Sequence, residues 1–287
     1  MTAEKQVRVW PRVVQRIAFA LIWTAALATL MVLAFIVLYV LRLGLPHVDW
    51  RFLSRYPEAM GREGGILPAI VGTVVLTLAA VAVAAPLGIG AAVFLTEYTW
   101  ESRVTRAVRF GAEALAGVPS IIYGLFGFIF FVTYLRMGWS ILSGALTLAI
   151  MILPTIIRTA EEAILTVPRP YRDVSFGLGA TRWQMVTSVV LPTALPGIVT
   201  GIILAIGRSV GETAAIIFTA GTALTMPTSL LSPARTMSVH FFVLAIEGIS
   251  LEKAYATGAI LILTTLLINV LANWLVVNAV RRHARRG

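Results

Sequence analysis

Several stretches of this chain carry no charged residue over a length that would cross a lipid bilayer. The first is 17–41 and the second is 64–96. A hydrocarbon core about 30 Å thick is spanned by about 20 residues of apolar helix. The chain as a whole is 59% hydrophobic and only 13% charged, which is unlike a soluble globular domain. These features predict an all-α polytopic membrane protein, because a helix satisfies its own backbone hydrogen bonds in lipid.

The apolar runs predict six transmembrane helices after a short, basic, cytoplasmic N-terminus at residues 1–16. We expect a single transmembrane domain, 17–287, with spans at about 17–43, 64–96, 111–135, 140–160, 191–220 and 254–280. The polar residues 161–190 then form a long loop. The uncharged stretch 213–234 is interpreted as an exit loop and not as a seventh span, because it contains two prolines and several Ser and Thr residues.

The distribution of basic residues predicts the orientation of these helices. With six spans both termini lie on one side, and most of the 23 Lys and Arg residues fall on that side of the membrane. The positive-inside rule therefore predicts a chain with both termini in the cytoplasm (N-in/C-in). The formal net charge of +10 then reflects topology and contact with anionic lipid, and we expect no nucleic-acid partner.

Motifs for catalysis and metal binding receive little support. The segment Gly207-Arg208-Ser209-Val210-Gly211 matches the G-x-S-x-G pattern of serine hydrolases, but it lies in an apolar helical run and no histidine falls in a span. The chain has no cysteine, and its three histidines form no ligand pair at helical spacing, so we expect no metal site. No lysine follows a glycine, which excludes a P-loop. We therefore expect no catalytic residue and no cofactor bound by this chain.

Two charges occur inside the fifth predicted span. Arg208 and Glu212 are four residues apart, so on a continuous helix they share one face and can pair. A charge in mid-membrane costs about 2.5–3.5 kcal/mol on insertion scales, so such residues usually face a polar cavity or the bundle interior. One interpretation is a structural ion pair that fixes helix packing. The other is that Arg208 helps to pass an anion. In this interpretation Glu212 holds the guanidinium in place and weakens its binding of the anion, so that the ion can leave. Glu113, in the third span, is interpreted as structural.

The loop at 161–190 contains a predicted amphipathic helix. Pro170 suits its first turn, and Tyr171, Val174 and Leu178 fall on one side of it. Two glycines end this helix, and the T-x-x-Q sequence that begins at Thr181 is a capping box for a second short helix. The residues leave two roles open: the helix could lie among lipid headgroups, or it could insert into the groove of a soluble partner.

The spacing of this loop resembles the EAA loop of ABC importer permeases, E-A-A-x3-G-x9-I-x-L-P. Asp173-Val174-Ser175 takes the place of E-A-A, and Gly179, Val189 and Leu191-Pro192 follow at the family's spacing. The segments 116–126 and 206–221, the second containing G-R-S-V-G-E-T-A-A, are similar to phosphate ABC transporter permeases. This form is closer to the PstA subunit than to its PstC partner.

The resemblance implies a type I ABC importer permease fold in the bacterial inner membrane and the import of inorganic phosphate. It also implies three partners: a PstC-like second permease, a PstB-like ATPase dimer that binds ATP and Mg²⁺, and a PstS-like extracytoplasmic phosphate-binding protein. Gly117, Pro119, Ser120 and Gly124 would break the third span or pack closely beside the path. The implied ATPase-coupling residues are Tyr171, Arg172, Asp173, Val174, Ser175, Leu178 and Gly179, and the expected substrate-path residues are Ser120, Arg208, Ser209, Glu212 and Thr213.

The sequence leaves two other functions open. One is an ABC permease for another oxyanion, such as molybdate or sulfate. The other is an ion-coupled secondary anion carrier, which would need no ATPase. The source of energy distinguishes the second of these from an ABC importer.

Overall fold

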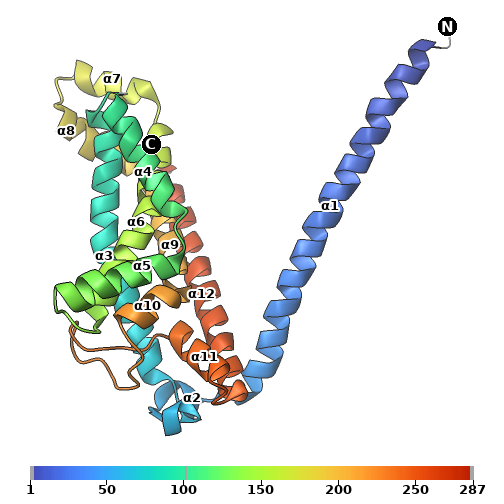
Figure 1. The fold of residues 1–287 in the computed structure, drawn as a ribbon. Coiled ribbons are helices and arrows are strands. Elements are labelled where there is room, and N and C mark those ends of the chain that lie inside the picture. The colour runs from blue at the N-terminus through green and yellow to red at the C-terminus, as the bar shows by residue number, and fades with distance from the viewer. Residues whose placement is uncertain (1–2, 101, 285–287) are drawn as a thin grey trace.

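The computed structural model describes residues 3–100 and 102–284 as a bundle of long helices (Figure 1). Among these residues, five helices are long and apolar enough to cross a membrane, and a sixth span results if one bent pair of helices counts as one. The only strands in the described part of the chain are two residues each. The prediction of an all-α polytopic membrane protein is therefore confirmed.

The spanning helices connect through short helices and loops. The long ones are α1 (Ala3–Gly44), α3 (Leu67–Val93), α6 (Ile141–Leu165), α9 (Leu191–Gly211) and α12 (Leu251–Ala284). The short helices are η1 (Leu45–His47), α2 (Trp50–Ser54), η2 (Ala59–Gly61), η3 (Phe94–Tyr98), α4 (Arg103–Ala116), α5 (Ser120–Gly127), η4 (Phe128–Tyr134), α7 (Arg169–Gly177), α8 (Arg182–Met185), η5 (Val186–Val190), α10 (Ala214–Thr219) and α11 (Met237–Ile246). The strands β1 (Pro57–Glu58) and β2 (Glu63–Gly64) pair antiparallel.

The centre of the bundle is the contact between α3 and α6. Small residues on α3 allow the two backbones to approach, as Gly88 shows: a Cβ there would lie 2.7 Å from the side chain of Ile156. Leu76, Leu148 and Ile152 are fully buried in the same cluster. In lipid, helices associate through such close van der Waals packing, because the surrounding solvent is as apolar as the side chains.

Helix α1 differs from the others because it projects away from the bundle (Figure 1). None of the side chains in its spanning window is buried. It meets the rest of the chain at its C-terminal end, where Gly44 packs against the backbone of Tyr255 on α12. A helix that is apolar all round and has no partner over most of its length is suited to contact with lipid or with another membrane subunit.

The third span, expected at about 111–135, is bent. Helices α4 and α5 meet at an angle of 100°, across the sequence Gly117-Val118-Pro119. Pro119 has no backbone N–H and cannot continue the helix. The hydroxyl of Tyr123 donates to the carbonyl of Leu115 at 2.8 Å and so closes the bend. The bend lies at Gly117 and Pro119, two of the residues at which the resemblance allowed for a break in this span.

The fifth span also differs from its predicted bounds of 191–220. The helix runs without interruption from Arg182 to Gly211 and stops there, because Glu212 adopts an extended backbone with φ −71° and ψ 132°. The next six residues form the separate helix α10. In the connection to the sixth span, where the sequence predicts only loop, the structure has the apolar helix α11.

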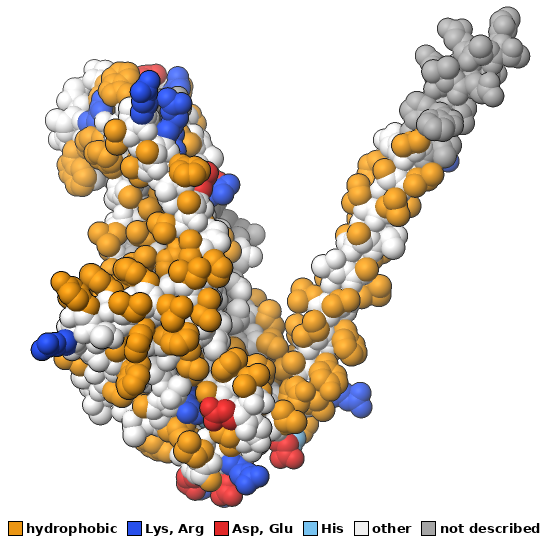
Figure 2. Space-filling view, in the orientation of Figure 1, with side chains coloured by type: hydrophobic (Ala, Val, Ile, Leu, Met, Phe, Trp, Pro, Cys, Tyr) orange, Lys and Arg blue, Asp and Glu red, His pale blue; other side chains and the backbone are white. Residues whose placement is uncertain are grey.

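Both ends of the helical bundle can be assigned a side of the membrane. The beginning of α1 and the end of α12 lie at the same end of the molecule as α7 and α8 (Figure 1). Lys and Arg side chains gather at the α7–α8 end (Figure 2). By the positive-inside rule this end is cytoplasmic, in agreement with the predicted topology.

Candidate functional site

Arg208 lies in the last turn of α9, near the middle of the bundle. Its neighbour Gly207 faces Asn269 of α12, since a Cβ on this glycine would lie 3.9 Å from the amide oxygen. At about 1.5 Å per residue, Asn269 is roughly 27 Å from the start of α12 at Leu251, about halfway along that 34-residue helix. The Arg208 side chain is exposed on the surface of the chain. A guanidinium is therefore presented at mid-membrane depth.

The predicted ion pair between Arg208 and Glu212 does not form. Among the side chains that the structure describes, no carboxylate lies within ion-pair distance of Arg208. Glu212 follows the end of α9, and its Oε1 accepts a hydrogen bond from the backbone N–H of Ala215 at 3.1 Å. Its carbonyl oxygen accepts from the hydroxyl of Ser238 at 2.5 Å. The helix break moves Glu212 off the face that carries Arg208.

The two breaks in the spanning helices meet. Helix α5 begins after the break at 117–119 and packs against α10, which begins after the break at Glu212. Gly124 permits this contact, because a Cβ there would lie 2.9 Å from the carbonyl oxygen of Ala214. Unwound backbone at membrane depth is tolerated only where protein or water satisfies it, and such broken helices often line a path for ions.

The remaining residues expected in the substrate path lie around this contact. Ser120 is half-buried at the start of α5, which packs on α10. Ser209 is buried, and its hydroxyl donates to the carbonyl of Ala205 at 2.9 Å, so it is occupied within its own helix. Thr213 precedes α10 and its carbonyl accepts from the N–H of Ile217. Arg208 is thus the member of this group that presents a full charge at the surface.

The predicted amphipathic helix at the cytoplasmic end is α7, and it is followed by the capped helix α8. Tyr171, Val174 and Leu178 are exposed, and Leu178 is 84% exposed. Gly179 ends this segment with a positive φ of 82°, which favours glycine. The Thr181 hydroxyl and the Gln184 side chain form the predicted capping box. An apolar face is therefore presented to the cytoplasm, with Asp173 exposed beside it.

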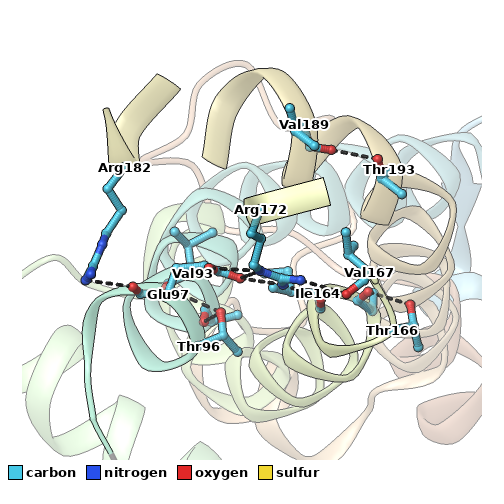
Figure 3. Close-up of polar contacts among 12 residues, drawn as sticks. Val93, Thr96, Glu97, Ile164, Thr166, Val167, Arg172, Arg182, Val189 and Thr193 are labelled. Atoms are coloured by element: carbon cyan, nitrogen blue, oxygen red, sulfur yellow. Dashed lines mark hydrogen bonds and ion pairs between the residues drawn. The ribbon is translucent and has the colours of Figure 1, made fainter. Parts of the chain in front are cut away.

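Two of the implied ATPase-coupling residues, Arg172 and Ser175, point inward. Arg172 forms an ion pair with Glu97 in η3, which continues α3, with Nη2 and Oε1 2.6 Å apart (Figure 3). The Arg172 and Glu97 side chains are 17% and 7% exposed. The Ser175 hydroxyl donates to the carbonyl of Tyr171. These two residues cannot be reached from the cytoplasm in the way that Leu178 can, because the helix presents its other face to solvent.

Glu97 is a residue that the sequence did not single out. It comes directly after the second uncharged run, in the π-helical end η3, and its partner lies 75 residues later. The one available signal was an acidic residue at the cytoplasmic end of a span, opposite a loop rich in arginine. A lone carboxylate at such a boundary is too common to identify its partner.

A cavity of about 300 Å³ lies at the same end, between α3, α4 and α6. Its wall includes Arg109 and Glu161, whose Nη2 and Oε1 atoms are 2.6 Å apart, together with Glu113 and Arg158. Within the described part of the chain, the buried Nε of Arg109 has no hydrogen-bond partner. Two acidic and two basic residues balance in this wall, so the cavity carries no net charge that would favour an anion.

Comparison with known proteins identifies relatives along most of the chain. Residues 84–285 match the family described as "Binding-protein-dependent transport system inner membrane component". The probable ABC transporter permease protein YqgI of Bacillus subtilis (strain 168) is 34% identical over 253 residues, covering 83% of this chain and 86% of that protein. The phosphate transport system permease protein PstA of Yersinia pestis is 32% identical over 99% of this chain and 96% of that protein. PstC of Mesorhizobium japonicum is 35% identical over 78% of this chain and 76% of that protein.

Solved structures share the fold at lower identity. A chain of a bacterial alginate ABC transporter, in complex with an alginate-bound periplasmic protein, superposes with a TM-score of 0.67 at 17% identity, over 93% of this chain and 96% of that one. A chain of the inward-facing MetNI methionine ABC transporter gives 0.63 at 18% identity, over 75% and 95%. The chain therefore belongs to the binding-protein-dependent transport system inner membrane components, and it is a multi-pass permease subunit of an ABC importer.

Proposed function

We propose that this permease carries inorganic phosphate into the cytoplasm as the PstA-like subunit of its importer. Relatives named as phosphate transport system permeases extend over nearly the whole chain. The observation that carries the proposal is Arg208, a guanidinium exposed at mid-membrane depth beside the meeting of two broken helices. An unpaired cation there is costly in hydrocarbon, so it faces a polar path, and a fixed positive charge favours an anion over a cation.

The chemistry of a guanidinium suits a tetrahedral oxyanion. Its planar fork of N–H groups can donate two parallel hydrogen bonds to phosphate oxygens. The adjoining unwound segment at Glu212 and Thr213 places further backbone groups at the same depth. In this role Arg208 attracts the ion, and the carboxylate of Glu212, held by the N–H of Ala215, keeps its negative charge away from the guanidinium.

The energy for this movement comes from partners at the cytoplasmic end. The exposed face of α7, with Tyr171, Val174 and Leu178, has the size and spacing of a helix that inserts into the groove of a soluble protein. We propose that a PstB-like ATPase docks on this face. ATP and Mg²⁺ then bind to the ATPase and not to this chain. A PstC-like permease completes the path, and a PstS-like extracytoplasmic protein delivers phosphate.

The test is transport by the complex purified through a tag on this chain. After reconstitution into liposomes, uptake of radiolabelled phosphate should require ATP on the side of α7 and should be unaffected by collapse of proton and sodium gradients. An excess of unlabelled phosphate should compete with uptake, whereas sulfate and molybdate should not. Uptake that follows an ion gradient without ATP would show a secondary carrier, and competition by sulfate or molybdate would show a different oxyanion.

A further inference from the structure

Helix α7 is attached to the membrane-spanning helices mainly through polar contacts. Its larger apolar side chains face outward, and Ser175 is the one buried residue among its nine. A helix held in this way has little apolar packing to transmit a force. The side chain that reaches inward from α7 is Arg172.

The guanidinium of Arg172 contacts two spanning helices at once (Figure 3). On one side, Nε and Nη2 donate to the carboxylate of Glu97, at 3.0 and 2.6 Å from Oε1. On the other, Nη1 donates to the carbonyl of Val167 at 2.6 Å and Nη2 to that of Ile164 at 3.1 Å. The last carbonyls of a helix lack partners within it, and a cation is favourable there. Arg172 therefore joins the end of α3 to the end of α6.

Helix α8 is attached to the same point. Nη1 of Arg182 donates to the backbone carbonyl of Glu97 at 3.0 Å (Figure 3). The same guanidinium lies over the ring of Tyr98, 5.7 Å from its centroid. Below these contacts, buried residues from α3, α6, α8 and α9 form one cluster, including Val93 and Met185. Helix α8 and the cytoplasmic ends of three spans thus form a single packed unit, to which Arg172 attaches α7.

This unit continues to the candidate substrate path. Helix α6 packs against α5 and α10. At Gly127 of α5 a Cβ would collide with Thr147 of α6 and lie 2.8 Å from Thr219 of α10, so the three helices are in close contact at this point. A displacement of α6 would therefore reach the contact beside Arg208, because closely packed elements move as bodies and do not deform continuously.

We propose that the Glu97–Arg172 ion pair transmits movement of the docked ATPase from α7 to α3 and α6, which makes Glu97 a positioning residue for ATP-driven transport. This inference rests on the proposed function, since it requires an ATPase on α7. A buried, forked ion pair suits the role because it fixes both distance and orientation, which a single hydrogen bond does not. Docking and transmission then lie on opposite faces of one helix.

The experiment separates docking from transmission in the reconstituted complex. In Glu97→Gln the ATPase should co-purify as in the wild type, because the outer face of α7 is unchanged. Phosphate carried per ATP hydrolysed should fall about fivefold or more. The matched control is Glu162→Gln, which removes the same charge from an exposed pair with Arg158 on α6 and should leave that ratio within about twofold of the wild type. A Glu97→Gln complex with the wild-type ratio, or one whose uptake and hydrolysis fall in parallel, would overturn the inference.

A second variant keeps the test decisive if Glu97→Gln accumulates poorly. The chain has no cysteine, so Glu97→Cys with Arg172→Cys introduces a unique pair of thiols into it. Before the thiols are linked, the phosphate carried per ATP hydrolysed should be lower than in the wild type. A short reagent that bridges the two thiols should restore this ratio to about half of the wild-type value or more. Neither single-cysteine variant should respond. No recovery on bridging would contradict transmission through this point, whereas failure of the wild-type chain to co-purify an ATPase would instead contradict the proposed function.

Discussion

Gly124 of α5 lies against the backbone of Ala214 at the start of α10, so closely that a Cβ on the glycine would be 2.9 Å from the Ala214 carbonyl oxygen. Contacts this short with backbone require the helices to separate. Gly124→Ala should therefore lower the stability of the solubilised protein by about 1–3 kcal/mol, and Gly124→Leu should lower it further. Thermal unfolding in detergent measures the effect.

A glycine in open space provides the control for this prediction. Gly90 lies within α3. Apart from its chain neighbours and the adjoining helix backbone, no atom of the described residues lies within 4 Å of the position of a Cβ. Gly90→Ala should leave the melting temperature unchanged or raise it, because alanine favours a helix by up to about 1 kcal/mol over glycine. Equal losses in Gly90→Ala and Gly124→Ala would show that the close approach of α5 to α10 is not what the glycine provides.

Arg208→Gln should abolish most phosphate uptake without affecting assembly. Loss of charge-assisted hydrogen bonds to an anion costs about 1.5–3 kcal/mol each, which corresponds to a decrease of about tenfold or more. Arg208→Lys should retain part of the uptake, since it keeps the charge but not the planar fork. Arg51→Gln on α2, an exposed arginine in an outer connection, serves as the control. Wild-type uptake by Arg208→Gln, at equal amounts of protein in the membrane, would contradict the path assignment.

Leu178→Asp should release the ATPase without unfolding the permease. Leu178 is 84% exposed, so the substitution should change the stability of the chain by no more than about 0.5 kcal/mol. If the side chain is an anchor in the ATPase groove, co-purification should fall by about tenfold or more. Leu231→Asp, on a 64% exposed leucine in the outer connection between α10 and α11, is the matched control. Retention of the ATPase by both variants would place the docking surface elsewhere.

His240 should make the stability of the folded chain depend on pH. It lies in α11, between the fifth and sixth spans, where burial, followed by the charge of Arg235, lowers its pKa from 6.5 to about 4. The Nη1 of Arg235 is 3.3 Å from its Nδ1. The folded state then binds fewer protons than the unfolded state between these values, so stability should fall as pH decreases from about 6.5 to about 4, by roughly 3 kcal/mol in total.

The contribution of His240 can be separated from that of the carboxylates by comparing variants. The melting temperature of His240→Gln should fall less than that of the wild type across the same pH interval, because only the wild type must protonate a buried imidazole. Parallel curves for the two proteins would show that this histidine does not control the response.

Much of the fold could be predicted because it depends on local properties of the chain. The uncharged runs predict spans, and the arginines that flank them predict orientation. The capping box at Thr181 and the exposed face of α7 follow from helical spacing alone. The candidate substrate path was predicted less well. The sequence identified Arg208 as unusual for a span, but it predicted a helical pair with Glu212 that the end of α9 prevents.

The sequence alone determined that the chain crosses the membrane, which end is cytoplasmic and where an amphipathic helix lies, because apolarity, charge and helical period are properties of neighbouring residues. Only the tertiary structure decided where the spans break and which face of α7 turns inward. An unwound residue at membrane depth persists because a distant group satisfies it, as Ser238 does for Glu212. Similarly, Arg172 points inward because Glu97 and the end of α6 supply its hydrogen-bond acceptors. A partner 75 residues away cannot be identified from the residues that surround Arg172 in the sequence.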